Sequence, residues 1–197
     1  MHRLSLCAFA ATVLALAPVP ARAADDAAIK DKLDACFSCH GENGVSTVDG
    51  VPSIAGEPEL FLEWQLVFFR TGRVKSEIMA PVAAELSDDD IRAIGTALAK
   101  LPPIAAPPPA DDNPAMTEVG GRLAMGRNCV NCHGDGFHGQ QAAARLAGQR
   151  EEWLVKALHD YKSGARIGTG VASMPEIAFQ LNDEQMQALA HFLSRQR

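Results

Sequence analysis

The sequence predicts an all-α protein built of two tandem domains, and two observations lead to this prediction. The chain of 197 residues repeats itself with an offset of 92 to 95 positions, which is typical of duplicated units. Between the two copies lies a stretch that holds half of the chain's 12 prolines, a composition that favours an extended connector without helix or strand. We therefore expect a leader over 1–23, a first domain over 24–101, a Pro-rich linker over 102–114 and a second domain over 115–197.

Four short blocks recur in the same order in both copies and set the register between them. The first-domain blocks correspond in order to those of the second domain: 36–41 to 129–134, 54–56 to 146–148, 69–72 to 161–164, and 86–91 to 181–186. Because the order is preserved throughout, a residue in one domain has a counterpart in the other whose chemistry can be compared with its own.

Capping residues and hydrophobic spacing predict the helices of each domain. Ser87 and Asn182 are good N-cap residues, and each is followed three positions later by Asp or Gln, as in a capping box. Beyond each cap, apolar residues at i, i+3 and i+7 spacing form one helix face: Ile91, Ile94 and Leu98, and Met186, Leu189 and Leu193. Helices are also expected over 59–71 and 151–163 and before each Cys-x-x-Cys-His motif, and no strands are expected.

The first residues have the pattern of a secretory signal. Arg3 supplies a positive start, a largely apolar run of 14 residues follows from Leu4 to Ala17, and Ala21-Arg22-Ala23 offers small residues for cleavage. The apolar run is shorter than the ~20 residues that a membrane-spanning helix needs. We therefore expect an exported, periplasmic protein that is cleaved near Ala23 and has no permanent membrane insertion.

The charge of the chain excludes one class of function and suggests how partners dock. Without residues 1–23 the chain has 16 basic and 24 acidic residues, a formal charge of −8, so it lacks the basic balance that nucleic-acid binding requires. The charge is also uneven: residues 24–101 carry 7 basic and 14 acidic groups, whereas 115–197 carry 9 and 8. Such asymmetry predicts electrostatic steering of a partner.

The cysteines outside the leader all lie in two Cys-x-x-Cys-His motifs. Two thiols at this spacing can each add to one vinyl group of haem, while the adjacent histidine reaches the iron. A zinc site needs four ligands, and a thioredoxin-type pair or a disulfide leaves the histidines unexplained. The motifs therefore predict two covalently bound haem c groups, held at Cys36, Cys39 and His40 and at Cys129, Cys132 and His133.

Methionines are the expected sixth ligands of both irons. After the leader, Met79 is the only methionine of the first domain and His40 is its only histidine, which excludes an internal bis-histidine site there. Met79 and Met174 each lie nine residues before an aspartate of the last repeated block. We therefore expect His40 with Met79 and His133 with Met174 as the metal ligands. Because a thioether fills the sixth position and favours reduced iron, no catalytic residues are expected.

Further residues are candidates for supporting the haems. A ligating histidine usually donates its other ring N–H to a carbonyl or carboxylate, and Pro52 is the expected carbonyl source, with Ala144 as its counterpart. Four cations near the repeated glycines are candidates for pairing with haem propionates, with ordinary surface charge as the alternative: Arg70, Arg73, Lys162 and Arg166.

Taken together, these motifs resemble the di-haem class I cytochromes c of the c-four type. The matching segments are both Cys-x-x-Cys-His-Gly motifs, 52–56, 146–149, 69–73 and the Leu-Ser/Asn-Asp sequences before the final helices. The resemblance implies two cytochrome c domains related by an approximate two-fold, haems that meet near their propionate edges, and delivery of electrons in the periplasm to a terminal oxidase. The sequence departs from the pattern at Ala144, where a proline is expected, and in the loop 135–139.

Three functions remain to be separated. The first is an electron carrier between a quinol-oxidising complex and a terminal oxidase or other respiratory acceptor. The second is a dedicated cytochrome subunit that accepts electrons from a periplasmic dehydrogenase. The third is a di-haem peroxidase, which requires one iron with an open position and is therefore disfavoured by two His/Met sites. We expect redox proteins as partners and no enzymatic activity.

Overall fold

The computed structural model describes residues 26–103, 113–168 and 174–197, and these residues form helices and loops. Within these ranges no strand is present, and one isolated bridge joins Gln140 and Ala143. The all-α fold class is therefore confirmed. The predicted leader and most of the Pro-rich linker lie outside the described residues.

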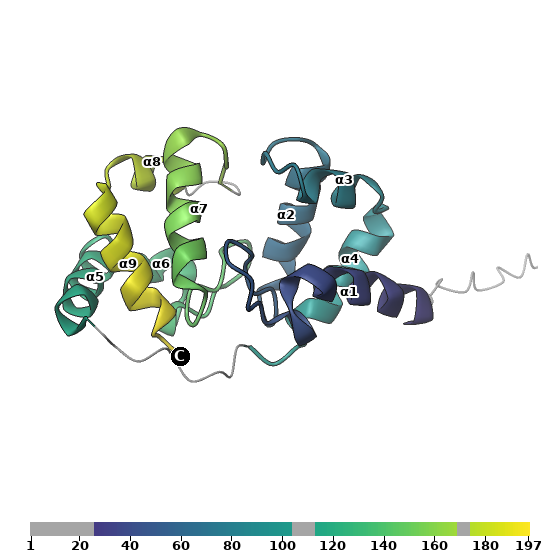
Figure 1. The fold of residues 1–197 in the computed structure, drawn as a ribbon, viewed down its shortest axis with the longest axis horizontal. Coiled ribbons are helices and arrows are strands. Elements are labelled where there is room, and N and C mark those ends of the chain that lie inside the picture. The colour runs from purple at the N-terminus through teal and green to yellow at the C-terminus, as the bar shows by residue number, and fades with distance from the viewer. Residues whose placement is uncertain (1–25, 104–112, 169–173) are drawn as a thin grey trace, which may run out of the picture.

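The same order of elements occurs twice along the chain. The first domain contains α1 (Asp26–His40), the 3₁₀ helix η1 (Glu42–Gly44), α2 (Glu59–Arg70), α3 (Met79–Ala84) and α4 (Asp88–Ala99). The second contains α5 (Pro114–Gly126), α6 (Val130–His133), η2 (Asp135–Phe137), α7 (Glu151–Ser163), α8 (Met174–Phe179) and α9 (Asp183–Ser194). Figure 1 shows the two domains side by side, with α2 and α7 on the sides that face each other.

Each domain has its own hydrophobic core. In the first, α2 packs against α3 and α4; in the second, α9 packs against α5 and α7, and α7 also packs against α8. The two predicted apolar faces lie in these cores, since the three residues on α4 are 1–3% exposed and those on α9 are 0–5% exposed. At ~25 cal/mol per Å² of buried apolar surface, these faces are the main stabilising contacts of the final helices.

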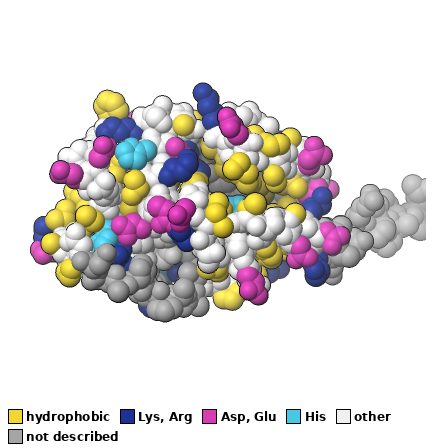
Figure 2. All heavy atoms as spheres, viewed as in Figure 1, with side chains coloured by type: hydrophobic (Ala, Val, Ile, Leu, Met, Phe, Trp, Pro, Cys, Tyr) yellow, Lys and Arg dark blue, Asp and Glu magenta, His cyan; other side chains and the backbone are white. Residues whose placement is uncertain are grey.

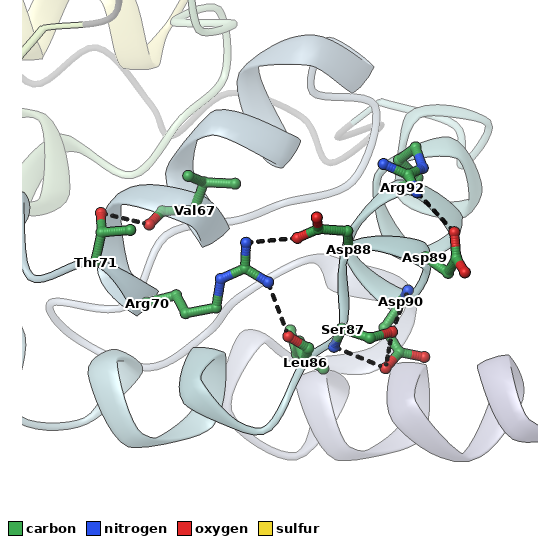
Figure 3. Close-up of polar contacts among 9 residues, drawn as sticks. All are labelled: Val67, Arg70, Thr71, Leu86, Ser87, Asp88, Asp89, Asp90 and Arg92. Atoms are coloured by element: carbon green, nitrogen blue, oxygen red, sulfur yellow. Dashed lines mark hydrogen bonds and ion pairs between the residues drawn. The ribbon is translucent and has the colours of Figure 1, made fainter.

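The starts of α4 and α9 are capped as the sequence predicts. The Ser87 side chain accepts a hydrogen bond from the backbone N–H of Asp90, and the Asp90 carboxylate accepts one from the Ser87 N–H (Figure 3). Asn182 and Gln185 make the same reciprocal pair at α9. Each box satisfies two backbone donors that a helix N-terminus would otherwise leave unpaired.

Three boundaries differ from the sequence-based expectation. Helix α2 ends at Arg70 rather than Thr71, because Thr71 has left the helical backbone angles (φ −91°, ψ 0°); its hydroxyl donates to the Val67 carbonyl (2.8 Å; Figure 3) at the C-cap. Pro114, expected in the linker, is the first residue of α5, where its fixed φ fits and its missing N–H costs nothing. The helix before the second motif is interrupted at Asn128, whose φ of 54° is tolerated by asparagine.

The surface has mixed character, and the helices are short. On the face drawn in Figure 2, hydrophobic side chains lie between acidic and basic ones over both domains. Large apolar residues exposed by more than 40% include Ile78, Val82 and Phe179. Among the described residues, no helix combines the length and the apolar character needed to cross a membrane.

Candidate haem sites

The cysteines of both motifs lie where a helical turn places them on one side of the chain. Cys36 and Cys129 are half-buried, Cys39 and Cys132 are exposed, and none of the four is in a disulfide. Burial raises the pKa of the Cys36 and Cys129 thiols, so these thiols are not activated as thiolates, unlike those of thiol-disulfide oxidoreductases. Among the described residues, no group of three or more His, Cys, Asp or Glu side chains gathers as a metal cluster.

The histidine of each motif is buried and held by one backbone carbonyl. Nδ1 of His40 lies 2.8 Å from the Pro52 oxygen, and Nδ1 of His133 lies 2.8 Å from the Ala144 oxygen. Because a carbonyl only accepts, Nδ1 carries the hydrogen, and Nε2 keeps the lone pair that can bind iron. Burial lowers the pKa of both imidazoles, which keeps them neutral. The predicted carbonyl sources are confirmed, and the missing proline at Ala144 leaves the contact intact.

The loop 135–139, whose role the sequence left open, supports the second carbonyl. The carbonyl of Phe137 accepts hydrogen bonds from Leu146 N and Ala147 N, as the carbonyl of Gly44 does from the corresponding residues of the first domain. Phe137 adopts a φ of 61° at this position. Its side chain is buried and meets the Phe192 ring edge-on at 5.7 Å, so core packing compensates for the strained backbone.

The two predicted methionine ligands occupy equivalent places in the fold. Met79 is the first residue of α3, and Met174 is the first residue of α8. The Ser76 hydroxyl accepts a hydrogen bond from the Met79 N–H at 3.0 Å and so helps to start α3. Both side chains are half-buried. Their coordination of iron stays a prediction.

Two of the four cations that are candidates for pairing with propionates make hydrogen bonds within their own domain. Arg70 donates to the Leu86 carbonyl at 3.0 Å and pairs with Asp88 at 2.6 Å, which joins the end of α2 to the start of α4 (Figure 3). Its counterpart Lys162 donates to the Leu181 carbonyl at 2.5 Å. Both cations therefore connect helices within their own domain, and their pairing with propionates stays a prediction. Arg73, the third candidate, is exposed and lies over the Phe68 ring.

Arg166, the fourth candidate, is buried between the domains and has unused hydrogen-bonding capacity. Its Nη1 donates to Gln65 Oε1 at 2.6 Å, and its guanidinium lies 5.3 Å from the Trp153 ring centre. In the described part of the chain, Arg166 Nε and Gln65 Nε2 are buried without an acceptor. A buried donor without a partner costs about 1–3 kcal/mol. Carboxylates such as haem propionates would satisfy these donors, so the residues present fit haem.

Sequence reasoning missed the residues that join the domains beside these sites. Glu57 and Gln149 are 5% and 4% exposed, and each is hydrogen-bonded to backbone of the opposite domain. A signal was available, because the two positions are 92 residues apart and therefore equivalent in the repeat. Their contacts, however, depend on how the domains pack.

The chain is similar to several known cytochromes and electron acceptors. A family model for cytochrome c matches residues 118–196. The chain is 32% identical over 179 residues to a thiosulfate dehydrogenase electron acceptor of Thiomonas intermedia, covering 86% of this chain and 82% of the relative. It is 29% identical over 186 residues to cytochrome c4 of Azotobacter vinelandii, covering 87% and 89%. The crystal structure of reduced cytochrome c4 from Pseudomonas stutzeri shows the same fold, with a TM-score of 0.76 at 24% identity over 88% of this chain and 99% of that one.

Two covalent attachment motifs, each with a buried histidine presented by a carbonyl, define a c-type cytochrome with two haem groups. The chain belongs to the cytochrome c family, in its di-haem c4-type group. It binds two haem c groups covalently, functions in electron transfer and exchanges electrons with redox partners.

Proposed function

We propose that the chain is a periplasmic electron carrier in which each iron is bound by one histidine and one methionine, His40 with Met79 and His133 with Met174. The main support is the matched geometry of the two histidines, each with Nδ1 at 2.8 Å from a carbonyl and Nε2 left for iron. The equivalent positions of the methionines at the starts of α3 and α8 add to it. Residues 1–23 act as the export signal, and the mature domains span 24–101 and 115–197.

His40 with Met79 and His133 with Met174 would leave neither iron open to a substrate, and we therefore infer that the protein is not an enzyme. The thioether ligands keep the reduction potential high, because soft sulfur favours reduced iron. The protein's contribution is to hold the two neutral imidazoles in one tautomer and to exclude water from the ligands. It serves as a carrier to a terminal oxidase or another respiratory acceptor.

The ligand set is tested by replacing each methionine separately. In the oxidised holoprotein, Met79→Ala and Met174→Ala are each expected to remove half of the methionine-to-iron charge-transfer absorbance and to lower one of the two reduction potentials, because one iron loses its soft ligand. Met125→Ala is the control, since Met125 is 58% exposed and lies outside the predicted ligand set. Unchanged methionine-to-iron charge-transfer absorbance in both ligand variants would exclude this assignment.

A second candidate, the acceptor subunit of a periplasmic dehydrogenase, is favoured by the relative from Thiomonas intermedia. The acidic first domain supports docking of a basic partner, since residues 24–101 hold 7 basic and 14 acidic groups. We expect a thiosulfate dehydrogenase to reduce the oxidised chain. The rate of this reduction should fall at least about tenfold when the ionic strength is raised from low to above physiological values. Failure of thiosulfate and dehydrogenase to reduce the chain would leave the carrier function alone.

A further inference from the structure

The carbonyl that accepts the Nδ1 hydrogen of each motif histidine belongs to a peptide unit whose N–H donates to a side chain of the opposite domain. In the first domain this unit joins Pro52 to Ser53: the Pro52 oxygen accepts from His40 Nδ1, and the Ser53 N–H donates to Gln149 Oε1 at 2.9 Å. Gln149 belongs to the second domain. One planar peptide therefore links His40 to a side chain across the interface.

The second domain has the reciprocal arrangement. The Ala144 oxygen accepts from His133 Nδ1, and the N–H of the next residue, Arg145, donates to Glu57 Oε2 at 2.8 Å. Glu57 belongs to the first domain and is 5% exposed. The relation is a repeat of the first, since Glu57 and Gln149 are 92 positions apart, as are Ser53 and Arg145.

The two cross-domain side chains also differ in chemistry. Gln149 makes two hydrogen bonds with the Ser53 backbone: its Nε2 donates to the Ser53 oxygen at 2.9 Å, and its Oε1 accepts from the Ser53 N–H. Glu57 presents a carboxyl group at the equivalent place and accepts from the Arg145 N–H. A carboxyl group and an amide differ as hydrogen-bonding groups, so the two peptide units are held by chemically different partners.

A peptide group transmits such a contact to its own carbonyl. An acceptor on the N–H increases the negative charge on the oxygen, and consecutive hydrogen bonds of this kind strengthen one another by roughly 10–30% per bond. A stronger Nδ1–H···O bond makes the imidazole a better donor to the metal and so stabilises oxidised iron. Removing the acceptor should have the opposite effect.

We propose that Gln149 and Glu57 are positioning residues that tune the iron of the opposite domain, Gln149 acting on the His40 site and Glu57 on the His133 site. Each holds the peptide unit that accepts the histidine's Nδ1 hydrogen, so that domain docking sets both reduction potentials. This inference rests on the histidine ligation proposed above.

The cleanest test is Gln149→Ala, because this change alters no charge. In redox titrations of the holoprotein, we expect the equilibrium constant for reduction of the His40-bound iron to rise about tenfold, which is about 59 mV for a one-electron couple, with the His133-bound iron unchanged. The two couples are assigned with the methionine variants. The His40 Nδ1–H resonance should also show faster exchange with solvent, as expected of a weakened hydrogen bond. Gln187→Ala, on an exposed part of α9, should change neither potential.

Two further variants separate tuning from loss of docking. Gln149→Glu retains an acceptor for the Ser53 N–H and should leave the His40-bound iron at or below its original potential, and Glu57→Ala should raise the potential of the His133-bound iron more than that of its neighbour. Equal shifts of both irons, or no shift in any variant, would overturn the inference while leaving both methionine bands and the proposed function intact. Absence of the methionine bands in the unmodified protein would instead show that the proposed ligand set had failed.

Discussion

Gly120→Ala is expected to destabilise the second domain by about 1–3 kcal/mol or more, although alanine is the better helix former. Gly120 lies in α5 where this helix crosses α9. A Cβ added there would lie 2.0 Å from the Ala188 carbonyl oxygen and 2.7 Å from the Phe192 Cβ. These distances are far below van der Waals contact, and backbone cannot move aside as a flexible side chain can. The two helices would have to separate, which disturbs the core around Leu189 and Leu193.

The matched control is Gly126→Ala in the same helix. A Cβ at Gly126 would meet no atom within 4 Å, so only helix propensity changes, and the variant should be neutral or more stable by up to about 1 kcal/mol. Urea denaturation of both holoproteins, followed by far-UV circular dichroism, measures the two free energies of unfolding. Equal stabilities for the two variants would contradict the close α5–α9 crossing.

The stability of the protein is expected to fall as the pH rises from about 4.5 to about 8 because of Glu57. Burial raises the pKa of this carboxyl group from 4.5 to about 8, although its contacts with Arg145 and Gln149 oppose the shift. Between these two pH values the folded protein holds a proton that the unfolded chain has lost. The free energy of unfolding therefore decreases with pH in this window, by at most about 1.4 kcal/mol per pH unit. Below about pH 4.5, the contribution of Glu57 to the free energy of unfolding is constant.

Glu57→Gln should remove this dependence. The amide cannot ionise, and it can still accept from the Arg145 N–H as Gln149 does from the Ser53 N–H in the other domain. The variant should therefore gain stability relative to the original protein between about pH 5 and about pH 8, by several kcal/mol at the upper end. Glu59→Gln, at an exposed position of the same segment, is the control. Parallel stability curves for Glu57→Gln and the unmodified protein, from urea denaturation at each pH, would refute the raised pKa.

Much of the local structure follows from local sequence. The capping boxes at Ser87 and Asn182 and the apolar faces of α4 and α9 were predictable, because caps and helix periodicity depend on residues within one or two turns. The break before the second motif was not predicted, although Asn128 is one of the residue types that tolerate positive φ. Phe137 gave no such signal, because its left-handed backbone is stabilised by packing against Phe192, 55 positions away.

The role of the cations could not be decided before the chain was folded. The positions of Arg70 and Lys162 near the repeated glycines are compatible with pairing to propionates. In the structure, each donates to a backbone carbonyl just before the final helix of its domain. Arg166 differs only because the first domain places Gln65 beside it, 101 positions away. Pairing of charged side chains depends on which partners the fold brings within hydrogen-bond reach.

The chemistry of attachment, the duplication and the helical class follow from the order of residues alone, because thiol spacing, repeat register and helix periodicity are local properties of the chain. The contacts by which Glu57 and Gln149 hold the peptide units that support the opposite histidines arise, in contrast, from the packing of the two domains. Those contacts join residues 88 and 96 positions apart. They exist because a backbone N–H that is buried at a domain interface requires a hydrogen-bond acceptor. Which side chain supplies that acceptor depends on how the two domains pack together.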